Sequence, residues 1–288
     1  MAHRQRPGRG RLISQRVDYG MAELVADPAR ARAWTLLIDG TPQSHVDLDD
    51  PEYLDFEYVR RLGHVVDLAA PPGQPVRVLH LGAGGLTLAR YVAATRPRSR
   101  QLAFEVDAAL VALIRRALPA APLARLRIRL GDARALLEQV PAGSFDVIIS
   151  DVFVAGRTPA HVTSVEFAVA AARALSPSGV FGVNAADGGG LVFARAQAAT
   201  VRSVFPDVCV IADPSVLRGR RFGNLVLAAS SGTLPVAALT RLTAADPFPA
   251  RVLHGEELLK FAAGARPVTD ADARPSPRAP PDVLTAGS

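Results

Sequence analysis

The sequence is poor in cysteine and has no long apolar run, and each scarcity excludes a class of protein. Cys209 is the only cysteine of 288 residues, so no internal disulfide can form, and the six histidines are too scattered to suggest a zinc site. No apolar run reaches the roughly 18 residues needed to cross a bilayer. No apolar segment follows the basic N-terminus, so it does not read as a secretory signal. We expect a cytoplasmic protein with no metal site and no membrane partner.

Lysine is also nearly absent, although the chain is basic. Lys260 is the single lysine among 33 Lys and Arg residues, and the formal net charge is +6. Several arginines fall near the two ends of the sequence, and no interior stretch interleaves basic with aromatic residues as nucleic-acid surfaces do. We therefore expect a solvated, arginine-rich surface and no nucleic-acid partner. Hydrophobic residues make up 49% of the sequence, which is enough for a sizeable core.

Composition divides the sequence into four parts. Residues 1–16 read as a flexible basic tail. Residues 17–72 are expected to form an N-terminal β-hairpin domain with a linking helix, because Asp39-Gly40 between two extended segments is a strong two-residue turn signal. Residues 73–264 form the main domain. Residues 265–288, rich in Pro, Ala, Asp and Arg, are predicted to be a disordered tail.

In the main domain, short apolar strands alternate with amphipathic helices. This alternation predicts a mostly parallel sheet covered by helices on both faces. The loop between the last two strands is too short for a crossover helix, so the last strand should be antiparallel. The predicted fold class is α/β: a Rossmann-like, seven-stranded, mostly parallel sheet with a small N-terminal antiparallel sheet. The expected strands are 76–82, 101–106, 127–132, 146–152, 180–185, 208–213 and 224–230.

Three segments follow the first three of these strands, where open α/β sheets bind ligands. The turn Gly82-Ala83-Gly84-Gly85 opens a helix and lets a ligand approach the backbone. Glu105 can accept hydrogen bonds from both hydroxyls of a ribose. Asp132 can accept from an adenine amino group, and the small Ala133 leaves room for the ring. Together these residues predict a nucleoside site.

Each of these segments also has a plainer interpretation. Gly84 could serve only a tight turn, Glu105 could be a surface acid, and Asp132 could be a helix N-cap. Three such coincidences in the three expected places favour the nucleoside site instead. A dinucleotide site is disfavoured, because Thr87 stands where the dinucleotide fingerprint has its third glycine.

With these residues in place, the sequence resembles the spermidine synthase (polyamine aminopropyltransferase) family, on the class I S-adenosylmethionine methyltransferase-like scaffold. The resemblance runs from about Trp34 to Ser230 and includes the hairpin segment LLIDGTPQSHVDLDDPEYLD, which ordinary methyltransferases of this fold lack. It implies a transferase of polyamine biosynthesis that moves an aminopropyl group from decarboxylated S-adenosylmethionine to a small-molecule amine. No prosthetic group is implied. Family members commonly dimerise, which leaves a homodimer through the front sheet open.

The resemblance also assigns roles to residues. Asp151, after the fourth strand, would be the base that takes a proton from the amine. Tyr53 and Asp55 would contact the acceptor. The nucleoside co-substrate would be held by Gln43, Gly82, Gly84, Gly85, Glu105, Asp132 and Ala133.

Three positions depart from the family's pattern. Val154 and Gly85 stand where the family has acids, and Arg218-Gly219-Arg220-Arg221 replaces a Tyr-Pro-Ser-Gly-like segment. Each change removes something that a cationic polyamine favours. Two other functions therefore stay open: an S-adenosylmethionine-dependent methyltransferase on the same scaffold, and a non-catalytic nucleoside-binding paralogue.

Overall fold

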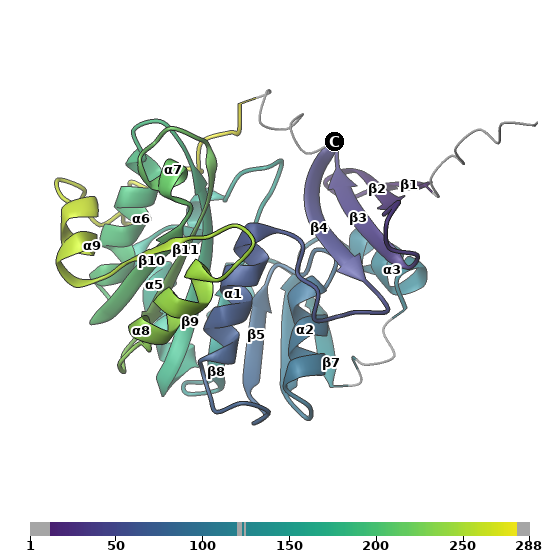
Figure 1. Cartoon of the computed structure of the whole chain (residues 1–288), viewed down its shortest axis with the longest axis horizontal. Helices are drawn as coiled ribbons and strands as arrows, with labels where there is room; N and C mark the ends of the chain where they lie inside the picture. Colours follow the sequence, from purple (N-terminus) through teal and green to yellow (C-terminus); the bar gives the residue numbers. More distant parts are fainter. Residues whose placement is uncertain (1–11, 120–122, 124, 281–288) are drawn as a thin grey trace, which may run out of the picture.

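The computed structural model describes residues 12–119, 123 and 125–280 of the chain. Two sheets organise it, and Figure 1 shows the smaller one in purple at the upper right of the larger. The smaller sheet is antiparallel and keeps chain order: β1 (Leu12–Val17), β2 (Gly20–Ala26), β3 (Ala33–Ile38) and β4 (Thr41–Asp47). The predicted turn joins β3 to β4, with Asp39 and Gly40 both at positive φ, 48° and 75°.

The N-terminal tail is shorter than predicted. We expected residues 1–16 to be flexible, but Leu12 to Val17 pair with β2 along their whole length. Exposed and half-buried side chains alternate along β1, which suits an edge strand. The turn after β1 is fixed to the main domain, since the Asp107 carboxylate accepts the backbone N–H groups of Asp18 and Tyr19 at 3.2 and 3.1 Å. Residues 1–11 lie outside the described residues.

The larger sheet has eight strands in the order β12-β10-β11-β9-β8-β5-β6-β7. All seven predicted strands are present, and neighbours from β9 to β7 pair in parallel. The predicted antiparallel strand, β11, lies between β9 and β10. The eighth strand, β12, is three residues on the edge and too short to give a pattern. The strands are β5 (Arg77–Leu81), β6 (Arg100–Glu105), β7 (Leu126–Leu130), β8 (Phe145–Ser150), β9 (Leu175–Asp187), β10 (Asp207–Ala212), β11 (Gly223–Ser230) and β12 (Arg251–Leu253).

Helices cover both faces of this sheet, as the alternation predicted. One face carries α1 (Glu57–Asp67), α2 (Thr87–Thr95) and α8 (Val236–Ala244). The other carries α4 (Ala133–Leu137), α5 (Val165–Ala174), α6 (Val192–Arg202) and α9 (Gly255–Phe261). The N-terminal sheet packs on α3 (Ala108–Ala117) and the start of α2. Short turns of helix are α7 (Pro214–Leu217) and η2 (Ala160–Val162).

Helix α1 does more than link two parts of the chain. Val59, Leu62, Val65 and Val66 are buried against strands of the central sheet. Burial of four such side chains, at about 1.5–3 kcal/mol each, makes α1 part of the main core. Within the described residues, no helix has the length and apolar character needed to cross a bilayer.

The predicted C-terminal tail is ordered over its first part. We expected disorder from residue 265, but residues 265–280, named here the C-terminal strap, run along the protein surface as an extended segment. Asp270 pairs with Arg134 at 2.5 Å, and the Ser276 side chain is fully buried. The polar composition of this segment suggested disorder, but these long-range contacts fix the segment on the main domain. Residues 281–288 lie outside the described residues.

Candidate active site

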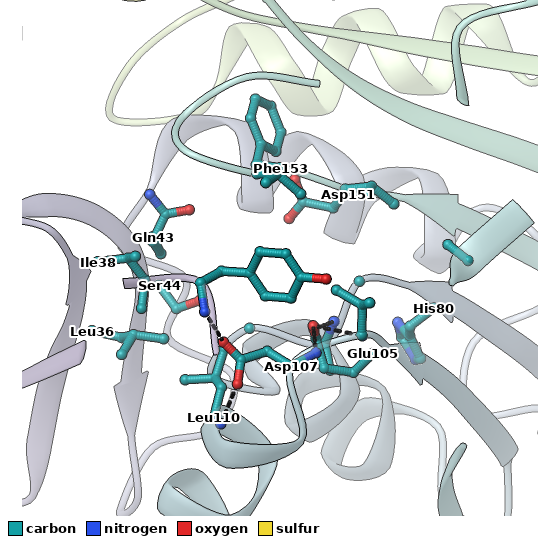
Figure 2. A pocket seen from close by; sticks show the side chains of 18 of the residues that line it. Leu36, Ile38, Gln43, Ser44, His80, Glu105, Asp107, Leu110, Asp151 and Phe153 are labelled. Atoms are coloured by element: carbon teal, nitrogen blue, oxygen red, sulfur yellow. Dashed lines mark hydrogen bonds between the residues drawn. The ribbon is translucent and has the colours of Figure 1, made fainter. Parts of the chain in front are cut away.

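A cavity of about 660 Å³ opens at the carboxyl ends of the parallel strands, beneath the N-terminal sheet. This is where open α/β sheets bind ligands. Figure 2 shows Gln43, Asp151 and Phe153 on one side of it, with Glu105 and Asp107 across from them. Of the residues predicted to hold a nucleoside or act as the base, the cavity wall contains Gln43, Gly82, Gly84, Glu105, Asp132, Ala133 and Asp151.

The glycine turn forms the floor between β5 and α2. Gly82 has φ +86°, and a Cβ there would lie 2.3 Å from the main-chain oxygen of Asp151. Only glycine permits this close approach of two strand ends. The turn therefore brings the backbone near Ala83 directly beside the carboxylate-bearing end of β8, so a ligand on the turn also faces Asp151.

Glu105 ends β6 with its carboxylate already oriented. One oxygen accepts the N–H of Ala83 at 2.9 Å, and the other accepts those of Val106 and Asp107 at 2.9 and 3.0 Å. A carboxylate has about four acceptor positions, so Glu105 keeps capacity for a ligand hydroxyl beside these three bonds. The three backbone donors fix the group without a cation, which suits it to a neutral diol such as a ribose.

Asp132 follows β7 and has two structural partners. It caps α4 by accepting the N–H of Ala135 at 2.9 Å, as the plainer interpretation predicted, and it lies 2.8 Å from His161 Nε2. Burial raises the pKa of this carboxyl, but the bonds from Ala135 and His161 outweigh burial and leave the pKa below its ordinary value. Asp132 is thus a charged acceptor at the cavity wall, beside the small Ala133.

Asp151 follows β8 and is a half-buried acid of the cavity wall. Asn184 Nδ2 donates to it at 2.8 Å, and Asn224 Nδ2 donates to Asn184 at 3.0 Å, so a relay of amides orients the carboxylate. Burial raises its pKa to about 6, although hydrogen bonds from Asn184 and Tyr58 partly oppose this. A carboxyl with this pKa is mostly ionised at neutral pH, and it is basic enough to take a proton from a bound group.

Three predicted site residues are not in the cavity wall. The Tyr53 hydroxyl donates to Asp55 at 2.9 Å, and its ring covers the Arg30 guanidinium, 3.7 Å from the ring centre, on the flank of the N-terminal sheet. Gly85 lies behind the wall, where its N–H donates to Ser44 Oγ at 3.0 Å. A Cβ at residue 85 would be 3.0 Å from side-chain atoms of Ser44 and Val46. The close packing of β4 thus accounts for glycine at a position where the resemblance leads us to expect an acid.

The sequence analysis missed other residues in the wall. Tyr58 is half-buried, and its hydroxyl donates to the main-chain oxygen of Gln43 at 3.1 Å and lies against Asp151, so it stands where we expected Tyr53. Tyr19 comes from the β1–β2 turn, and Arg278 comes from the C-terminal strap. For Tyr58 the signal was present, since it begins the helix that lines the site. Arg278 gave none, because only long-range contacts place it there.

The described part of the chain contains no cluster of three or more His, Cys, Asp or Glu side chains that could hold a metal ion. The cavity wall contains carboxylates, backbone N–H groups, the phenols of Tyr19 and Tyr58, and the imidazole of His161.

Comparison with known proteins gives a consistent picture. Residues 55–223 match the model of the spermine/spermidine synthase domain. A probable spermidine synthase from Corynebacterium glutamicum ATCC 13032 is 36% identical, with a TM-score of 0.82 over 89% of this chain and 95% of that one. Spermidine synthase from Thermotoga maritima has the same fold, at 19% identity and a TM-score of 0.57 over 91% of this chain and 82% of that one.

A spermidine synthase bound to the transition-state analogue AdoDATO is also similar in fold, at 19% identity and a TM-score of 0.60 over 88% of this chain and 85% of that one. No curated protein is significantly similar in sequence. The domain match covers more than half of the chain, and the Corynebacterium protein exceeds 30% identity over nearly all of it. The chain therefore belongs to the spermine/spermidine synthase family of transferases.

Proposed function

We propose that the protein transfers an aminopropyl group from decarboxylated S-adenosylmethionine to an amine. The observation that carries this proposal is the position of Asp151: a half-buried carboxylate with a raised pKa, across one cavity from the oriented carboxylate of Glu105. A nucleoside held at Glu105 would present its sulfonium side chain toward Asp151. The similarity to spermidine synthases supports the same donor.

The donor side of the cavity consists of the glycine turn 82–84, Glu105, Asp107 and Asp132-Ala133. Glu105 would accept from a ribose hydroxyl, and Asp132 from the adenine amino group. Gln43, on β4, would contact the donor from above. Tyr19 supplies an aromatic face at the same mouth, since its backbone is fixed to Asp107.

The transfer needs a base and alignment more than it needs electrophilic activation. The ammonium of the acceptor first gives a proton to the Asp151 carboxylate, leaving a free amine. Its lone pair attacks the aminopropyl carbon bonded to sulfur; the N–C bond forms, the C–S bond breaks, and the electron pair moves to sulfur. Neutral methylthioadenosine leaves, the product keeps its charge as a secondary ammonium, and Asp151 releases its proton to water. Holding the two reactants in line accounts for the remaining rate enhancement.

Calorimetric titration with decarboxylated S-adenosylmethionine and with S-adenosylmethionine, side by side, tests the donor. Tighter binding of the decarboxylated form, by tenfold or more, is expected. Tighter binding of the intact form contradicts the proposal and favours the methyltransferase alternative. The observation that favours this alternative is the N-terminus of α2, which follows the glycine turn in the cavity wall and would stabilise the methionine carboxylate of the intact form.

The non-catalytic alternative predicts a different result. A paralogue that only binds a nucleoside would take up the donor and release no methylthioadenosine with any amine. Detection of methylthioadenosine by chromatography, with Asp151→Asn as the matched inactive variant, separates the two. Release that depends on both an amine and Asp151 supports the transferase.

A further inference from the structure

The part of the cavity beyond Asp151 has a chemistry unlike the donor side. Its wall is the segment 152–156, here named the acceptor loop, with the sequence Val-Phe-Val-Ala-Gly. This loop carries no charged side chain and turns back on itself through a bridge between Val154 and Arg157. An acceptor amine delivered to Asp151 would therefore lie along an apolar wall.

The C-terminal strap adds to this wall from outside the main domain. Ser276 pairs with Thr158: its N–H donates to the Thr158 oxygen at 3.0 Å, and its Oγ accepts the Thr158 N–H at 2.9 Å. The Arg157 guanidinium also donates to the Ser276 oxygen, at 2.5 Å. Two residues further on, Arg278 and Ala279 line the cavity. Figure 1 shows the yellow end of the strap above the central sheet, on the side where the cavity opens.

The strap is fastened at several points upstream. Asp270 accepts from both terminal nitrogens of Arg134, at 2.5 and 2.6 Å, and from Ser164 Oγ at 2.6 Å. These bonds hold the pKa of the Asp270 carboxyl at about 2. Bidentate pairs of this kind are the strong ones, so the strap is a fixed wall of the cavity.

The charges at this end favour one kind of acceptor. Among the described residues that line the cavity, the other acids are already engaged: Glu105 and Asp107 by backbone N–H groups, Asp132 by α4 and His161, and Asp39 by the N–H of Met21. Of the acceptor-loop and strap residues that line the cavity, the charged one is the cation Arg278. A second ammonium on the acceptor would meet apolar groups and a guanidinium, whereas a carboxylate would meet a partner.

We propose that the C-terminal strap completes the acceptor end of the cavity, and that Arg278 with the acceptor loop selects an amine whose far end is a carboxylate rather than a second ammonium. This inference rests on the proposed function, since it names the acceptor of the same transfer. The substrate class is then an ω-amino acid with a short apolar chain.

Three acceptors of matched length test this class. Putrescine, butylamine and 4-aminobutanoate each have four carbons and an amine at one end. They differ in the group at the far end, which is an ammonium, a methyl and a carboxylate, respectively. Their dissociation constants are measured by calorimetry on the full chain saturated with methylthioadenosine, which needs no turnover. We expect 4-aminobutanoate to bind about tenfold more tightly than putrescine. Equal or tighter binding of putrescine overturns the inference, and so does tightest binding by butylamine.

Variants of the strap assign the effect to Arg278. Arg278→Glu should reverse the order of 4-aminobutanoate and putrescine, and Arg278→Ala should bring the two within about threefold, since an exposed charge contributes modestly. Arg274→Ala removes another exposed arginine of the strap that does not line the cavity, and it should leave both constants unchanged. An unchanged order in Arg278→Glu overturns the role of Arg278.

A parallel assay separates this inference from the proposed function. Methylthioadenosine release from decarboxylated S-adenosylmethionine is measured with each of the three acceptors. Release with putrescine above that with 4-aminobutanoate overturns the acceptor class and leaves the transfer in place. No release with any acceptor, combined with preferred binding of 4-aminobutanoate, overturns the aminopropyl transfer and leaves the carboxylate preference of the cavity in place.

Discussion

The two ends of the cavity are built on different principles. At the donor side, acidic side chains are held by backbone N–H groups: Glu105 by three of them, and Asp107 by those of Asp18, Tyr19 and Leu110. At the proposed acceptor end, one half-buried carboxylate, Asp151, is followed by the apolar loop 152–156, and the cation Arg278 also lines the cavity. The donor side therefore has several carboxylates, whereas the proposed acceptor end has one.

This contrast predicts which part of the site can change between members of the family. The donor-side acids are tied into strand ends and helix caps, so losing one would also cost local structure; Asp107 and Asp132 both cap helices. Apart from Val152, which packs against the core, the described contacts tie the acceptor loop only through its own turn, so its other side chains can change at less cost to the fold. We therefore expect the donor to be retained and the acceptor to differ.

Asp151→Asn tests the contrast with the largest expected effect. Because Asp151 would be the only base beside the acceptor, we expect kcat to fall by about 10²- to 10⁴-fold. The dissociation constant of methylthioadenosine should stay within about threefold, since the donor side is untouched. Wild-type kcat should also rise as pH increases through about 6, the pKa of Asp151. A pH-independent kcat, or a fall below tenfold, would remove Asp151 from the mechanism.

Glu105→Gln tests the donor side. The amide would place an N–H₂ group against backbone N–H donors, and it would weaken the bonds to the ribose hydroxyls. We expect methylthioadenosine to bind about 10- to 100-fold more weakly by calorimetry. Glu138→Gln, an exposed position on α4, is the matched control and should bind as wild type. Unchanged affinity in Glu105→Gln would mean that the nucleoside lies elsewhere.

Asp151→Asn should also stabilise the fold. Folding raises the pKa of Asp151 from 3.8 to about 6, so the folded state binds the proton more tightly. Its contribution to stability therefore declines as pH rises from about 4 to 6, and the penalty stays constant above that. Chemical denaturation at pH 7.5 should show the variant more stable by about 1–3 kcal/mol, with the gain vanishing near pH 4. An equal gain at both pH values would point to packing instead of charge.

Val154→Asp gives the smallest expected effect. It adds a carboxylate to the acceptor loop, where the diamine otherwise finds none, and should tighten putrescine binding by about three- to tenfold. Val154→Asn has nearly the same shape without the charge and should not tighten it. Equal gains in both variants would mean that shape, and not charge, sets the acceptor.

Much of the fold could be predicted because its signals are local. Seven strands of the central sheet and the turn at Asp39-Gly40 follow from apolar runs and turn residues. Gly82, Glu105, Asp132 and Asp151 end successive strands, and parallel strands bring their carboxyl ends to one edge. The position of these four residues at one edge of the sheet was therefore predictable from the sequence.

The rest depends on contacts that the local pattern does not show. The strap looked disordered because its composition is polar, and only pairing with Arg134 and Thr158 fixes it. Tyr53 and Tyr58 lie five residues apart on the same segment, and only Tyr58 falls within α1. The local pattern did not show where α1 begins, so we expected Tyr53 and not Tyr58 in the site. The burial of Gly85 could not be foreseen, since it arises from the packing of β4 on the glycine turn.

A one-tube competition tests the central contrast most directly. Equimolar 4-aminobutanoate, butylamine and putrescine are incubated with wild-type protein and decarboxylated S-adenosylmethionine, and the aminopropylated products are counted by mass spectrometry. We predict that methylthioadenosine accumulates and that the adduct of 4-aminobutanoate is the most abundant. Spermidine as the main product would contradict the account, because it would mean that a second ammonium is favoured at an end of the cavity where we find apolar groups and Arg278.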